Sequence, residues 1–94
     1  MYARATTYRG SPEQVQEAVV HYEEGVPSTR EIAGNRGVVL LVDRAAGKGV
    51  GITFWDSEEA MQASRKRADE LRQQAQEPGG DPVDEYEVAV WAVG

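Results

Sequence analysis

The sequence contains no cysteine and only one histidine, His21, among its 94 residues. Without cysteine there is no disulfide framework, no thiolate nucleophile and no thiolate metal site. A single imidazole also excludes any site that needs two histidines from one chain. The acidic residues form adjacent pairs that diverge on a helix, which does not predict a metal site. We therefore expect no metal and no cofactor.

Basic residues and long apolar runs are scarce as well. Ten Lys and Arg are outnumbered by sixteen Asp and Glu, which gives a net charge of −6. Nucleic-acid binding requires a basic surface that neutralises phosphates, so we expect no nucleic-acid partner. No stretch approaches the ~20 apolar residues of a membrane span, and the first residues lack the layout of a signal peptide. These features predict a cytoplasmic protein that does not contact membranes.

The most informative segment that is present runs from residue 49 to residue 60. Its first half alternates in the way typical of a β-strand, which ends at Trp55. Asp56 or Ser57 then supplies a helix N-cap, and Glu58 and Glu59 stand in the first turn, where acidic residues are favourable. The segment therefore predicts a strand that leads directly into a helix.

A similar junction occurs near the start of the chain. Residues 2–8 are rich in strand formers, Ser11 is a good N-cap, and apolar residues then recur with helical periodicity until Gly25 and Pro27 end the helix. The remaining segments give two more strands and a second helix. The full predicted set is strands at residues 2–8, 37–42, 50–55 and 85–93, with helices at residues 12–26 and 57–75.

This order, β-α-β-β-α-β, predicts an α+β protein of the ferredoxin-like class, a single domain over residues 1–94. Right-handed crossovers place the first and third strands at the centre of a four-stranded antiparallel sheet and both helices on one face. Residues 37–42 are continuously apolar, so we expect that strand to be buried on both faces. Two helices cover only one face, so we predict a homodimer in which the sheets face each other.

At this level the chain resembles the antibiotic-biosynthesis-monooxygenase-like domains of the dimeric α/β-barrel superfamily. The resemblance covers essentially the whole chain. Its most specific parts are the run Phe54-Trp55-Asp56-Ser57-Glu58-Glu59-Ala60 and the pattern Val26-Pro27 … Gly34-Asn35-Arg36-Gly37 that leads into the second strand.

The resemblance implies one of two oxidative activities. Some members oxidise polycyclic phenols with dioxygen and neither metal nor flavin, and others degrade haem. The haem degraders resemble one another in a strand-end tryptophan, a histidine on the second helix and an asparagine on the first strand. Trp55 matches the first, but Ser64 and Arg65 stand where the histidine should fall, and Thr6 and Thr7 stand in place of the asparagine. Haem degradation is therefore disfavoured.

Two functions remain open. One is a cofactor-independent monooxygenase that acts on an aromatic, polyketide-type small molecule. The other is a non-catalytic module that binds a small ligand or only assembles. The second helix presents small residues to the sheet, so either it lies very close to the sheet or a cavity remains beneath it, and such a cavity would have the character of a small-molecule site. The candidate cavity residues are Trp55, Tyr22, Met61, Ser64, Ala68 and Leu71.

Other candidates fit structural roles better. Helical geometry places His21 about 120° from the centre of the apolar stripe, on the solvent side of its helix, so it is a poor general base. Arg4 and Arg36 could reach an anionic ligand, but lone arginines are normally surface residues. No residue in the pattern stands out as a general base.

Overall fold

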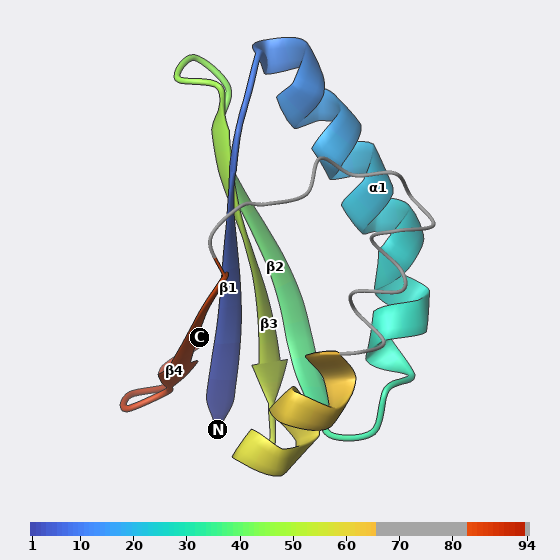
Figure 1. Ribbon diagram of the computed structural model, residues 1–94, viewed down its shortest axis with the longest axis vertical. Coiled ribbons are helices and arrows are strands. Elements are labelled where there is room, and N and C mark those ends of the chain that lie inside the picture. Colours follow the sequence, from blue (N-terminus) through green and yellow to red (C-terminus); the bar gives the residue numbers. More distant parts are fainter. Residues whose placement is uncertain (66–82, 94) are drawn as a thin grey trace.

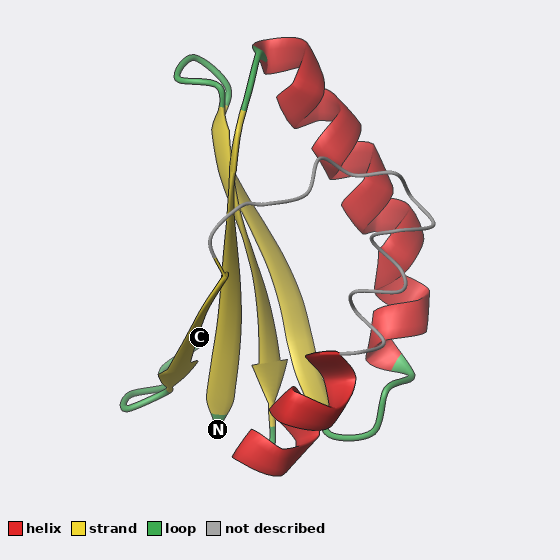
Figure 2. Ribbon diagram, in the orientation of Figure 1, coloured by secondary structure: helices red, strands yellow, loops and turns green. Residues whose placement is uncertain are grey.

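A computed structural model describes residues 1–65 and 83–93 of the chain. It contains strands β1 (Tyr2–Arg9), β2 (Asn35–Asp43), β3 (Lys48–Trp55) and β4 (Val83–Glu87) and helix α1 (Pro12–Arg30). A second helix is described from residue 58 to residue 65. The strands form one antiparallel sheet in the order β2-β3-β1-β4, with both helices on the same face (Figures 1 and 2). This is the predicted ferredoxin-like α+β fold.

Helix α1 begins as predicted but ends later. Ser11 forms a capping box with Gln14, in which each side chain bonds the other residue's backbone N–H. The helix then continues through Pro27 to Arg30, so the predicted end near residue 26 is wrong. The last turn is held by Arg30, which donates hydrogen bonds to the backbone and side-chain oxygens of Asn35 at 3.2 and 2.7 Å. These bonds tie the last turn of α1 to the first residue of β2.

Neither described helical segment is long and apolar enough to cross a membrane.

The β2–β3 hairpin depends on a glycine. Gly47 has a φ of +67°, a conformation that L side chains rarely adopt, and it accepts a 2.7 Å hydrogen bond from the N–H of Gly10. A Cβ at position 47 would collide with the backbone carbonyl of Gly10. Asp43 closes the turn by accepting a hydrogen bond from the N–H of Ala46 at 3.1 Å. The hairpin tip is thus fixed against the β1–α1 junction.

The last strand is shorter than the sequence predicted. The chain pairs with β1 from Val83 to Glu87, and residues 88–93 are not a strand. The reason lies in the register: Glu87 is opposite Tyr2, and the N–H of Val88 bonds the carbonyl oxygen of Met1 at 2.8 Å. The ladder between β1 and β4 thus ends at the first residue of β1.

The two faces of the sheet differ in character. Strand alternation and the register place one apolar set on the face away from the helices. This open face carries Ala3, Ala5, Val39, Leu41, Val50, Ile52, Phe54 and Tyr86. Val39 and Leu41 are exposed on it, so the prediction that β2 is buried on both faces is wrong for the single chain. The C-terminal segment lies against this face, where Trp91 packs edge-to-face on Phe54 at 4.9 Å between ring centroids.

Two glycine-to-alanine changes should have opposite effects on stability. Gly47→Ala should lower the free energy of unfolding by about 1–3 kcal/mol, because it forces a left-handed backbone and meets the Gly10 carbonyl. Gly25→Ala, inside α1, meets no atom within 4 Å and should raise it by about 0.5–1 kcal/mol. Urea unfolding of both variants measures the difference. A neutral effect of Gly47→Ala would contradict the described hairpin geometry.

Candidate functional site

The helix-covered face of β1 and β3 gathers the polar side chains of the sheet centre. Arg4 is opposite Thr53, and Thr6 is opposite Gly51. These residues share a face because side chains two apart on a strand point the same way. Tyr22 of α1 marks this face as the covered one, because its ring lies directly over Gly51.

At one end of this face two tyrosines meet. The hydroxyls of Tyr8 on β1 and Tyr22 on α1 are 2.8 Å apart, and their rings pack edge-to-face at 5.9 Å between centroids. Tyr22 reaches this position only because Gly51 has no side chain, since a Cβ there would overlap the Tyr22 hydroxyl. The expectation that Tyr22 faces the sheet is therefore confirmed.

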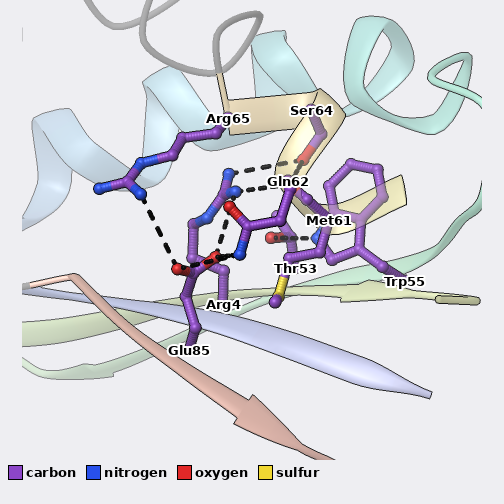
Figure 3. Close-up of polar contacts among 8 residues, drawn as sticks. All are labelled: Arg4, Thr53, Trp55, Met61, Gln62, Ser64, Arg65 and Glu85. Atoms are coloured by element: carbon purple, nitrogen blue, oxygen red, sulfur yellow. Dashed lines mark hydrogen bonds and ion pairs between the residues drawn. The ribbon is translucent and has the colours of Figure 1, made fainter. Parts of the chain in front are cut away.

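At the other end Trp55 is the largest fully buried side chain, with 1% of its surface exposed. Its indole N–H donates a 2.9 Å hydrogen bond to the hydroxyl of Thr53, two residues earlier on the same face of β3. Figure 3 shows the indole on the same side of the sheet as Met61 of the second helix. Trp55 thus lies under that helix and not in the open face.

The start of the second helix brings two more predicted residues to this place. Ser57 is its N-cap, because its hydroxyl accepts a 3.1 Å hydrogen bond from the N–H of Ala60. One turn later Met61 and Ser64 are both buried. The Ser64 hydroxyl donates a 2.6 Å hydrogen bond to the carbonyl oxygen of Met61.

Arg4 corrects the sequence-based interpretation, which placed it at the surface. It is 5% exposed and extends from β1 beneath the second helix (Figure 3). Its guanidinium donates hydrogen bonds to the Met61 carbonyl at 2.6 Å and to the Ser64 hydroxyl at 3.5 Å. The carboxylate of Glu85, the cross-strand neighbour on β4, lies 3.6 Å from the same group. A buried positive charge therefore lies on the same side of the sheet as Trp55.

The Glu85 carboxylate also meets two side chains of the second helix. The Gln62 amide lies 3.3 and 3.5 Å from its two oxygens, and Arg65 lies 3.9 Å away. Three donors thus converge on one carboxylate at the β4 edge of the sheet (Figure 3).

The other predicted residues divide into three groups. Ala68 and Leu71 lie outside the described residues, so their place in the site stays a prediction. His21 is half-buried, so it is less exposed to solvent than its predicted place on the solvent side of the helix implied. Arg36 is exposed and forms a surface ion pair with Asp56 at 3.4 Å. Within residues 1–65 and 83–93, no three histidine or acidic side chains are grouped to hold a metal ion.

Sequence reasoning missed Arg4, Tyr8 and Thr53 as members of this face. The sequence did contain a signal for Thr53. It stands two residues before Trp55 on the same strand, so the two side chains point to the same face of the sheet. Arg4 and Tyr8 required the β1–β3 register, which only the folded sheet gives.

The fold is a ferredoxin-like domain, and Trp55 is buried on the helix-covered face of its sheet. The family model described as antibiotic biosynthesis monooxygenase matches residues 1–78, and the chain belongs to that family. The uncharacterized protein Rv2557 of Mycobacterium tuberculosis is 37% identical over 92 residues, which is 95% of this chain and 41% of that protein. The chain thus spans about two fifths of the length of this relative.

Solved structures share the fold at low identity. A monooxygenase from the gene ActVA-Orf6 of Streptomyces coelicolor, in complex with nanaomycin D, superposes with a TM-score of 0.78 at 19% identity. The alignment covers 99% of this chain and 91% of that one. The haem degrader MhuD of Mycobacterium tuberculosis, with two haems bound, has a TM-score of 0.73 at 19% identity over the full length of both chains.

Trp55→Ala should cost about 3–5 kcal/mol of unfolding free energy, because it removes a fully buried aromatic side chain. Trp55→Phe keeps a ring in place and should cost markedly less. Urea unfolding of both variants gives the comparison. A loss below about 1 kcal/mol for Trp55→Ala would show that the indole is not part of a packed layer.

Proposed function

We propose that this chain is a cofactor-independent monooxygenase that oxidises an electron-rich aromatic molecule bound against the helix-covered face of β1 and β3. The observation that carries the proposal is the combination on that face of Trp55, Arg4 and the Tyr8–Tyr22 pair in a member of this family. An indole wall accommodates a flat ring, and the polar groups orient its oxygens.

The proposed chemistry follows from what such a site supplies. The bound phenol gives up a proton, and the electron-rich anion passes electrons to dioxygen. One oxygen atom enters the substrate, converting a methylene to a carbonyl, and the other leaves as water. The substrate provides all the electrons, so the chain's own share is to exclude water, to orient the ring and to favour the anion. A buried guanidinium such as that of Arg4 favours an anion in this way.

We further propose that a second copy of the chain covers the open face of the sheet. Leu41 and Tyr86 are 55% and 56% exposed there. Leu41 is paired with Val50 and Tyr86 with Ala3, and half-buried Ile52 and Phe54 are on the same face of the intervening strand β3. A contiguous apolar surface of this kind marks an interaction site in a soluble protein. The same face on a second chain is self-complementary, as a twofold interface requires. The Trp91 side chain on Phe54 extends the apolar surface.

The monooxygenase proposal is tested with 1,8-dihydroxyanthrone and EDTA-treated protein, by following dioxygen uptake and anthraquinone absorbance. We expect one dioxygen consumed per quinone formed, and a rate about ten- to a hundredfold lower in Trp55→Phe, because the ring is held less well. Oxidation no faster than with heat-denatured protein would contradict the proposal. If calorimetry then still showed the anthrone bound, the chain would be a non-catalytic ligand-binding module.

The dimer is tested by sedimentation equilibrium at micromolar concentration. The wild-type chain should have twice the 10.3 kDa mass of one protomer. Leu41→Glu should give a monomer, because it places a charge on the exposed part of the apolar face. Val20→Glu is the matched control, since Val20 is exposed on α1 and should leave the dimer intact. A wild-type monomer, or equal dissociation of both variants, would overturn the interface.

A further inference from the structure

We propose that residues 88–93 of one chain pair, as a strand, with the outer edge of β2 in a second copy of the chain. The inference rests on the proposed dimer and adds the segment that joins its two copies through main-chain hydrogen bonds. The addition of a strand to a sheet edge is a recurrent mode of protein recognition. Each copy donates its own segment and receives that of its partner, as a twofold arrangement requires.

The two edges of the sheet are protected to different degrees. The edge strands are β2 and β4, which lie on opposite sides of the sheet in Figure 1. Strand β4 carries three acidic residues among its five, and charge on an edge opposes pairing with a further strand. Residues 37–42 of β2 contain neither a charged residue nor a proline, and Val39, Leu41 and Val42 are 39%, 55% and 38% exposed. In the described part of the chain only β3 pairs with β2, so the β2 edge is open to another strand.

The segment after β4 has the composition of a strand without being one. Residues 88–93 read Val-Ala-Val-Trp-Ala-Val, which has no charge, glycine or proline and is rich in strand formers. The N–H of Val88 bonds Met1, but the backbone of residues 89–93 forms no hydrogen bond with another described residue. Val90 and Val93 are 83% and 73% exposed. An exposed, uncharged, apolar run of this kind is suited to pairing with a strand edge.

A chain cannot place this segment along its own β2. Strands β1 and β3 separate β4 from β2, and neighbouring strands lie about 4.8 Å apart, so a strand outside β2 is roughly 19 Å from β4. Residues 88–93 span at most about 20–22 Å when fully extended. The crossing would therefore use nearly all of them and leave none to pair. The segment of a second copy does not have to make this crossing, and its length matches the uncharged part of β2, residues 37–42.

Trp91 holds the segment beside the face that the second copy covers. Its ring packs on Phe54 of the open face at 4.9 Å between centroids, yet Trp91 is still 49% exposed. Val39 and Leu41 of β2 are on the same face as Phe54. The edge pairing is therefore continuous with the proposed sheet-to-sheet contact, and the two contacts together bury the apolar side chains of the segment.

The first test compares the 94-residue chain with a chain that ends at Glu87, by sedimentation and by amide hydrogen exchange in ¹⁵N NMR. The N–H groups of an edge strand point alternately to the neighbouring strand and outward. In the full chain both sets within residues 37–42 should be protected, because β3 bonds one set and the partner's segment bonds the other. Removing residues 88–94 should speed exchange of the outward set at least about tenfold and raise the dimer Kd at least about a hundredfold. The amides of β1 and β3 should stay protected, which shows that the shortened chain is folded.

Two proline variants separate main-chain pairing from side-chain packing. Adjacent N–H groups of a strand point to opposite sides, so only one of Ala89→Pro and Val90→Pro removes a hydrogen bond to β2. That variant should raise the dimer Kd at least about tenfold, and the other should have a much smaller effect. Val90→Ala is the matched control, because it shortens the side chain and keeps the N–H. Equal effects of the two prolines, or outward β2 amides that exchange as fast in the full chain as in the shortened one, would overturn the proposal.

The outcomes separate this inference from the proposed sheet-to-sheet dimer. A wild-type dimer with unprotected outward amides in β2 would retain the contact between the open faces and reject the strand pairing. A dimer that survives Leu41→Glu but dissociates without residues 88–94 would retain the strand pairing and reject the contact between the faces. A wild-type monomer would reject both.

Discussion

The structure depends on one constraint: two helices cover only one face of a four-stranded sheet. Strand alternation then assigns every sheet residue either to the covered face or to the open one. Arg4, Thr6 and Thr53 of the two central strands are on the covered face, and the opposite face is mainly apolar, with Thr7 and Asp84 as polar members. A sheet that only needed a core would show the reverse pattern, with polar residues toward water. The pattern found here suits a ligand site under the helices and a partner on the other side.

Burying Arg4 makes stability and function depend on the same contacts. A charged group taken out of water is costly unless it is hydrogen-bonded and paired. The Met61 carbonyl, the Ser64 hydroxyl and the Glu85 carboxylate reduce that cost, and they join β1, the second helix and β4. Ser64 therefore has a structural reason to be small and polar. The same contacts set the orientation of the Arg4 guanidinium.

Much of the fold could be predicted because its signals are local. The Ser11 capping box, the Ser57 cap and the strand that ends at Trp55 depend on adjacent residues. The errors arose at the ends of elements. Helix α1 continues past Pro27 to Arg30, which bonds Asn35 of β2, and β4 ends opposite Tyr2, the first residue of β1. The same distinction holds for the candidate site, which stays a prediction: the place of Trp55 at the end of its strand follows from local pattern, whereas the burial of Arg4 depends on strand register.

The two tryptophans report on the two faces separately, so one measurement tests the central claim. Trp55 lies under the second helix, and Trp91 lies on Phe54 of the open face. Each indole N–H gives one cross-peak in a ¹⁵N–¹H correlation spectrum, and Trp91→Phe assigns them. Adding 1,8-dihydroxyanthrone under argon should shift the Trp55 signal and leave that of Trp91 in place, whereas dissociating the dimer with Leu41→Glu should do the opposite. An anthrone shift confined to Trp91 would contradict the account, because it would place the ligand on the open face.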